Sequence, residues 1–131
     1  MSRPVRAALL LVVFIAACGG SATAKDPLAD RVEHLEEHGF EAREVEPRGD
    51  PLPEAMAVVQ LDGAEATIYA FATGDEAQRA ASAFAAEEQA APERVRVQRE
   101  GTNVYVGRAP AGDELPAVDF EDVVSTSEEL H

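Results

Sequence analysis

From residue 26 to residue 46, the apolar positions first follow a helical period and then alternate poorly. Asp26 and Pro27 are typical of the N-cap and the first position of a helix. Gly39 suits the left-handed position that follows a helix end. The apolar residues at helical spacing between these signals are Leu28, Val32 and Leu35. The pattern predicts a short amphipathic helix, and the next stretch, Phe40 to Glu46, predicts a strand.

Two apolar runs rich in β-branched and aromatic residues follow a loop with three prolines at 47–53. The runs are Ala55 to Leu61 and Ala64 to Ala72, and each predicts a strand. Asp62 and Gly63 separate them, and this pair is typical of a two-residue turn. The sequence therefore predicts a tight β-hairpin.

A second helix is predicted after this hairpin. Thr73 and Glu76 have the spacing of a capping box, and Pro92 comes just beyond the predicted end. The apolar stripe of this helix consists of small side chains and one phenylalanine: Ala77, Ala80, Ala81, Phe84 and Ala85. Alanine side chains allow a helix to lie close against a sheet.

Two alternating segments, Glu93 to Arg99 and Asn103 to Arg108, predict a second hairpin, with Glu100-Gly101-Thr102 joining them. The order of helices and hairpins predicts an α+β domain over residues 26–108. We expect a small antiparallel sheet of about four to five strands, with two helices packed on one face.

Residues 109–131 contain seven acidic residues, two prolines and no Lys or Arg. This composition predicts an acidic, loosely ordered C-terminal tail. An alternative stays open, because four apolar residues of this segment are able to dock as a short element. They are Val118, Phe120, Val123 and Val124.

Residues 1–17 have the form of a signal peptide. Arg3 and Arg6 provide a basic start, and Ala7 to Ala17 is an unbroken apolar run of 11 residues. A transmembrane helix needs about 20 apolar residues, so this run is too short to span a bilayer.

The run ends in Ile15, Ala16, Ala17 and Cys18, followed by a small, polar stretch that extends to residue 25. An aliphatic residue, two small residues and a cysteine resemble the lipobox of a bacterial lipoprotein precursor. The resemblance implies that diacylglycerol is attached to the Cys18 thiol, that cleavage occurs before Cys18, and that acyl chains such as palmitate anchor the protein. Residues 18–25 then form a flexible tether. The alternative is an ordinary secretory signal with an incidental cysteine.

Charge restricts the partners of the chain. Its net charge is −14, and loss of Arg3 and Arg6 with the signal peptide changes this to −16. Such a chain is unsuited to nucleic acid, and anionic lipid headgroups repel it, so the acyl chains must hold it at the membrane. In lipoprotein sorting, Asp after the cysteine favours the inner membrane, and Gly19 takes that place here. We expect a cell-envelope location, on the outer face of the cytoplasmic membrane or in the outer membrane.

His34 and His38 belong to an H-x-x-E-H pattern and are spaced to share one helix face, where both could reach Zn²⁺. Proteases with this pattern need a third ligand far downstream and a much larger domain. The alternative is a pair of exposed histidines that interact favourably with a helix C-terminus. We therefore treat His34 and His38 as weak metal-ligand candidates, and we expect no cofactor and no catalytic residue.

Four arginines lie on the second hairpin of this acidic chain: Arg94, Arg96, Arg99 and Arg108. Two interpretations are open. The arginines form ion pairs with nearby acids, which we favour, or Arg94, Arg96 and Tyr105 form a docking patch.

Beyond the lipobox, the predicted helix-hairpin-helix-hairpin pattern is also similar to small uncharacterised bacterial lipoproteins, a resemblance that implies no activity. We expect a membrane-anchored, non-enzymatic binding or interaction module with an unidentified envelope protein as partner. The alternative is a small zinc-binding or hydrolytic envelope protein that uses His34 and His38.

Overall fold

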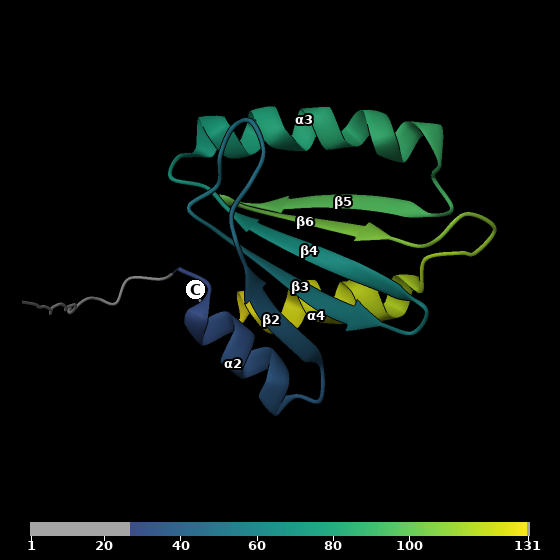
Figure 1. Cartoon of the computed structure of the whole chain (residues 1–131), viewed down its shortest axis with the longest axis horizontal. Helices are drawn as coiled ribbons and strands as arrows, with labels where there is room; N and C mark the ends of the chain where they lie inside the picture. The colour runs from purple at the N-terminus through teal and green to yellow at the C-terminus, as the bar shows by residue number, and fades with distance from the viewer. Residues whose placement is uncertain (1–26, 131) are drawn as a thin grey trace, which may run out of the picture.

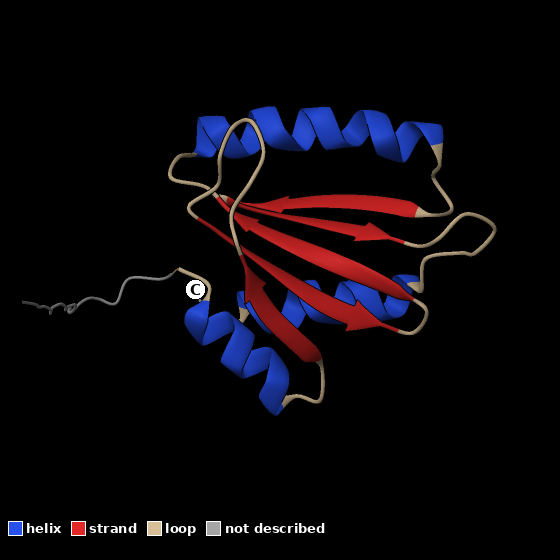
Figure 2. Ribbon diagram, in the orientation of Figure 1, coloured by secondary structure: helices blue, strands red, loops and turns tan. Residues whose placement is uncertain are grey.

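The computed structural model describes residues 27–130. The predicted signal peptide, the lipobox with Cys18 and the tether lie outside the described residues. Helices separate groups of consecutive strands along the chain, as Figures 1 and 2 show. In order they are α2 (Ala29–Glu37), β2 (Glu41–Val45), β3 (Ala55–Leu61), β4 (Ala64–Ala70), α3 (Gly74–Ala90), β5 (Val95–Glu100), β6 (Asn103–Arg108) and α4 (Ala117–Glu128).

The strands form one antiparallel sheet of five strands in the order β2-β3-β4-β6-β5. Both predicted hairpins are confirmed. Asp62-Gly63 joins β3 to β4, and Gly63 has φ of 74°, a backbone region that favours glycine. The second turn is shorter than predicted, because Glu100 pairs with Asn103 inside the sheet. The strand predicted over Phe40 to Glu46 is confirmed as β2, at one edge.

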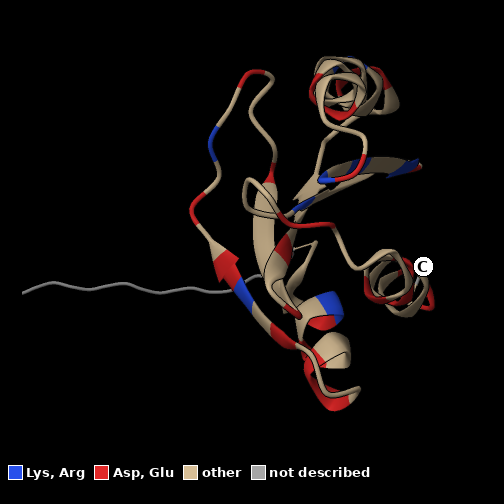
Figure 3. Ribbon diagram, turned by 90° about the vertical axis from the view of Figure 1, so that its right-hand side faces the viewer, with Lys and Arg blue, Asp and Glu red and all other residues tan. Residues whose placement is uncertain are grey.

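Helices cover both faces of the sheet. Helix α3 packs on one face, whereas α2 and α4 pack on the other, and Figure 3 shows the sheet passing between α3 and α4. The α+β class and the antiparallel sheet are confirmed, but the placement of the two predicted helices on one face is wrong. The reason lies in the central strands, whose successive residues enter opposite cores. Ile68 and Tyr69 in β4 do so, and so do Tyr105 and Val104 in β6.

Helix α3 begins as its capping signal predicts. The backbone N–H of Glu76 donates to Thr73 Oγ1 at 3.1 Å. Ala77 and Ala80 are buried against the sheet, and Phe84 packs at the side of this core. The small side chains bring α3 close to β5 and β6.

Helix α4 corrects the prediction of a loosely ordered tail. Phe120 and Val123 are fully buried, and Val124 is nearly so, at positions that repeat with the helical period. Two of the acidic residues that suggested disorder, Glu121 and Asp122, lie between these positions and are exposed. The folded domain therefore extends through α4 instead of ending at residue 108.

Helix α2 begins at Ala29, two residues later than the pattern predicts. Its end matches the prediction. Gly39 has φ of 96°, and the Phe40 N–H donates to the Leu35 carbonyl oxygen at 3.0 Å, as in a Schellman motif. This termination leaves His38 at the C-cap, next to the end of α4.

Candidate functional site

The beginning and the end of the described chain meet where α2 packs against the last turn of α4 (Figure 1). The Arg31 guanidinium of α2 donates to the backbone oxygen of Ser127 and lies 3.5 Å from a carboxylate oxygen of Glu128. A carbonyl in the last turn of a helix lacks the usual donor four residues on, and the Ser127 oxygen accepts from Arg31 in addition to a long contact with the Leu130 N–H at 3.4 Å. The contact with Arg31 fixes the position of α4 relative to α2.

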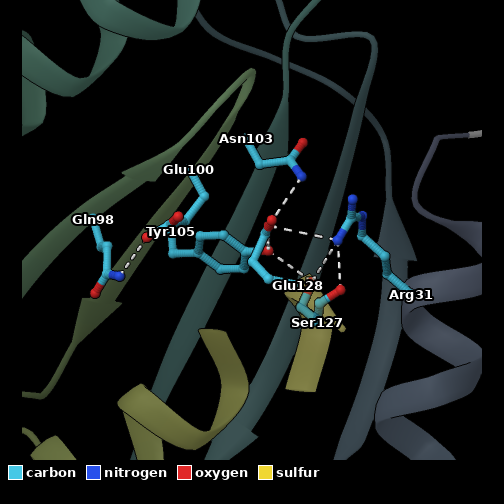
Figure 4. Close-up of polar contacts among 7 residues, drawn as sticks. All are labelled: Arg31, Gln98, Glu100, Asn103, Tyr105, Ser127 and Glu128. Atoms are coloured by element: carbon cyan, nitrogen blue, oxygen red, sulfur yellow. Dashed lines mark hydrogen bonds and ion pairs between the residues drawn. The ribbon is translucent and has the colours of Figure 1, made fainter. Parts of the chain in front are cut away.

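A buried phenol joins the same junction to the sheet. Tyr105 of β6 is fully buried, and its hydroxyl lies 2.7 Å from Ser127 Oγ and donates to the Glu128 carboxylate. The Asn103 side-chain amide also donates to that carboxylate, at 3.3 Å. Figure 4 shows Tyr105 and Arg31 reaching Glu128 from opposite sides. Glu128 is thus held by three donors from two elements, α2 and β6.

The environment of Tyr105 disfavours ionisation of its phenol. Burial raises its pKa well above the ordinary value, and the hydrogen bond to the Glu128 carboxylate raises the pKa further. The phenol therefore stays protonated and acts as a donor in the core.

This geometry corrects the docking patch predicted from Arg94, Arg96 and Tyr105. Tyr105 faces the α4 side of the sheet and is fully buried, so it cannot contact a partner. Sequence alternation did not reveal this, because β6 is covered on both faces.

The two arginines of that patch lie at the edge of the sheet. Arg94 donates to the Ala109 carbonyl oxygen at 3.3 Å, while Arg96 lies 3.9 Å from Glu88 of α3 and 3.9 Å from Glu121 of α4. The ion-pairing interpretation thus describes Arg96. Its side chain is still 40% exposed, and both ion pairs are long.

Arg108 makes the closest ion pair of this hairpin. It donates two hydrogen bonds to the Glu87 carboxylate, at 2.9 and 3.1 Å, and its guanidinium lies 5.5 Å from the centre of the Phe84 ring. The hydrogen bond from Arg108 lowers the pKa of Glu87. Phe84 and Glu87 both belong to α3, so Arg108 ties that helix to β6.

The two histidines share a face of α2, as their spacing predicts. Their ring centres are 4.4 Å apart, and His38 Nδ1 lies 3.0 Å from the His34 backbone oxygen. His34 Nε2 lies 2.7 Å from Glu129 Oε1, just after the end of α4. Ligand atoms of all three side chains lie within 4.8 Å of one another.

Glu129 was missed by the sequence analysis. It stands 95 positions after His34 and belongs to the segment predicted to be loosely ordered. Only the apolar period of α4, which places Glu129 at a helix end, could have indicated its position.

The predicted lipid-attachment residue Cys18 and the lipobox residues Ile15, Ala16 and Ala17 fall outside the described residues. Between residues 27 and 130, no helix has both the length and the apolar character needed to cross a bilayer.

No protein-family model, curated protein or solved structure matches the chain. Its function is therefore inferred from its own residues.

Proposed function

We propose that this chain is a lipid-anchored, non-enzymatic binding module of a bacterial cell envelope. The observation that carries the proposal is the sequence from Ile15 to Cys18, which follows a basic start and a short apolar run. Cys18 is the only cysteine, so the thiol at the expected cleavage position has no disulfide partner in the chain. The mature protein would begin at this residue.

The short tether between Cys18 and the folded domain supports a function close to the membrane surface. Among the described residues, the first buried side chain is that of Leu28, ten residues after Cys18. Ten residues span at most about 35 Å, so the domain stays close to the lipid surface. The acidic domain has no electrostatic attraction to anionic headgroups, and two or three acyl chains would supply the stable attachment.

The arginines at the β5 edge of the sheet support an acidic surface on the partner protein. Four of the arginines lie on or beside the β5–β6 hairpin, whereas acidic residues predominate on α2, β2 and α4 (Figure 3). Arg94 and Arg96 lie at the outermost strand, and Arg96 is shared between two distant carboxylates. An acidic segment of an envelope protein would replace these long ion pairs, while the rest of the surface repels it.

Two serine hydroxyls of the described domain, those of Ser82 and Ser127, have structural partners. Ser127 Oγ lies beside the Tyr105 hydroxyl, and Ser82 Oγ accepts a hydrogen bond from the Gln78 amide at 3.3 Å. These contacts are those of a helix surface and a core, which favours a binding role over nucleophilic catalysis.

The anchor is tested by replacing Cys18 with Ser in the producing bacterium. We expect wild-type protein in carbonate-washed membranes, with a lipid-modified Cys18 peptide in its mass spectrum, and we expect the variant in the aqueous fraction. Ser21→Ala, which changes the tether and keeps the thiol, is the matched control and should behave as wild type. An unmodified Cys18 in membrane-bound wild-type protein would refute the anchor.

The docking surface is tested by cross-linking in cells with the double variant Arg94→Ser/Arg96→Ser. We expect loss of one specific cross-linked protein with a melting temperature within about 3 °C of wild type, because exposed ion pairs contribute little. Arg43→Ser removes an arginine from the opposite edge of the sheet and should keep the cross-link. An unchanged cross-link in the double variant would place the surface elsewhere.

A further inference from the structure

We infer a binding site for one divalent transition-metal ion, best matched by Zn²⁺, formed by His34, His38 and Glu129. Two imidazoles and one carboxylate are a ligand set that suits Zn²⁺. The site joins the end of α2 to the residue that follows α4, and it is independent of the proposed lipid anchor and docking surface.

The distances fit coordination with small side-chain movements. The three ligand atoms lie within 4.8 Å of one another, and His34 Nε2 and Glu129 Oε1 are 2.7 Å apart. Ligand atoms around a tetrahedral zinc ion are separated by about 3.4 Å, given bond lengths near 2.1 Å. His34 and Glu129 must therefore separate slightly and His38 must approach them, which the two exposed side chains allow.

One hydrogen bond already orients the His38 ring for a metal. His38 Nδ1 lies 3.0 Å from the His34 carbonyl oxygen, an acceptor, so Nδ1 carries the proton and Nε2 keeps its lone pair. On the other ring, His34 Nε2 faces the Glu129 carboxylate at 2.7 Å and carries a proton that a metal ion must displace, while the Glu37 carboxylate lies 3.8 Å from Nδ1 and can accept the proton on that side. Acceptors behind ligating histidines commonly fix the tautomer that binds a metal.

Exposure indicates an exchangeable ion with an open coordination position. The His34 side chain is 20% exposed and that of Glu129 is 58% exposed. Three protein ligands leave a fourth position to water or to a ligand atom from a partner. Bound metal would join the first and last helices of the domain, because its ligands stand 95 positions apart.

The test uses the full-length chain in detergent after treatment with a chelator, titrated with ZnCl₂ and followed by calorimetry and thermal melting. We expect one Zn²⁺ per chain. At a free Zn²⁺ concentration of about a hundred times Kd, the melting temperature should rise by roughly 10 °C. Mg²⁺ should cause no shift, because it prefers oxygen ligands.

Variants assign the shift to these three residues. His38→Ala and Glu129→Gln should each weaken Zn²⁺ binding by at least about tenfold, with each melting shift measured against the same variant without metal. Glu36→Gln removes a charge from the same helix outside the site and should keep wild-type binding.

Two further variants remove the candidate ligands that lie outside the described residues. Cys18→Ser and His131→Ala should keep the Zn²⁺-dependent shift. The inference is overturned if wild-type protein shows no shift, or if the shift survives in the double variant His34→Ala/His38→Ala with an unchanged helical circular dichroism spectrum. Either result would leave the membrane anchor untouched, because fractionation of the Cys18→Ser variant reports on it separately.

Discussion

The two faces of the sheet are held in different ways. On the α3 face, the core is built from apolar side chains, and the helix lies close because Ala77 and Ala80 are small. On the α2–α4 face, an apolar core ends in a polar junction that contains Tyr105, Ser127 and Glu128. The candidate metal ligands lie at this second junction. In this protein, apolar packing with an exposed ion pair between Arg108 and Glu87 holds the α3 face, whereas the face with the candidate metal ligands adds a buried polar junction.

The largest expected effect comes from removing the main apolar contact of α4. Phe120→Ala should lower the free energy of unfolding by about 3–5 kcal/mol, because the ring is fully buried and leaves a cavity. Val118→Ala on the same helix is the matched control, since Val118 is 71% exposed and should change stability little. Urea denaturation measures both. Equal effects of the two substitutions would show that α4 is not packed as described.

The same glycine-to-alanine change should have opposite signs on the two faces. In Gly107→Ala, the new Cβ would lie 2.7 Å from Phe120 Cδ1 and 2.9 Å from Leu115 Cδ2, so α4 must move, at a cost of about 1–3 kcal/mol. In Gly74→Ala, at the start of α3, the Cβ meets nothing within 4 Å. This substitution should stabilise by about 0.5–1 kcal/mol. Thermal melting of both variants checks the contrast, and a stabilised Gly107→Ala would contradict it.

Tyr105→Phe should destabilise the protein by about 1–3 kcal/mol, because Ser127 and Glu128 lose a buried donor. The folded-state pKa of Tyr105 is above its ordinary value of 10.0. The unfolded phenol therefore ionises first as the pH rises, so the contribution of Tyr105 is complete below about pH 10 and is lost as the pH rises toward the folded-state pKa.

Urea denaturation between pH 7 and pH 11 measures this effect. The stability of the Phe variant should approach that of wild type at the alkaline end. Tyr69→Phe, on the α3 side of the sheet, is the control at pH 7 for removal of a phenol hydroxyl. A constant difference between wild type and Tyr105→Phe across this range would contradict the prediction.

The smallest effect is expected at the ion pair that ties α3 to β6. Glu87→Gln should cost less than about 1 kcal/mol at pH 7, since the Glu87 side chain is 48% exposed. Arg108 lowers the pKa of Glu87 below its ordinary value of 4.5. The contribution is therefore present above pH 4.5 and is lost as the pH falls through the lowered pKa. Denaturation curves of the two proteins should converge in acid and separate again at neutral pH.

Local signals in the sequence predicted the elements that depend on neighbouring residues. Asp62-Gly63 predicted the first hairpin, and Thr73 predicted the start of α3, because turn and capping chemistry acts within a few residues. The strand β2 was also predicted, although Glu44 breaks its alternation of apolar and polar residues. This edge strand buries only Ala42, so it can form without a regular alternation.

Contacts across long separations were not predictable in the same way. The acidic composition of residues 109–131 favoured a loose tail, so a docked segment at α4 was kept only as an alternative and the contact of Glu129 with His34 was missed. The alternation of β6 indicated one buried face, yet Val104 and Tyr105 are both fully buried because helices cover both sides. The alternation of residues along a strand does not show whether helices cover one face of the sheet or both.

The pairing of α2 with α4 also orders the events of folding. Helix α2 is synthesised early. Leu28 at its N-cap and Leu35 on its apolar face share a core with Phe120, and this core is complete only after Phe120, near the end of the chain, has been synthesised. Such non-local closure is slow relative to hairpin formation. The β3–β4 and β5–β6 hairpins can form early, whereas the contacts between α2 and α4 form only after α4 has been synthesised. Until then the apolar face of the N-terminal helix stays incompletely covered, a state that would suit the membrane export that we propose above.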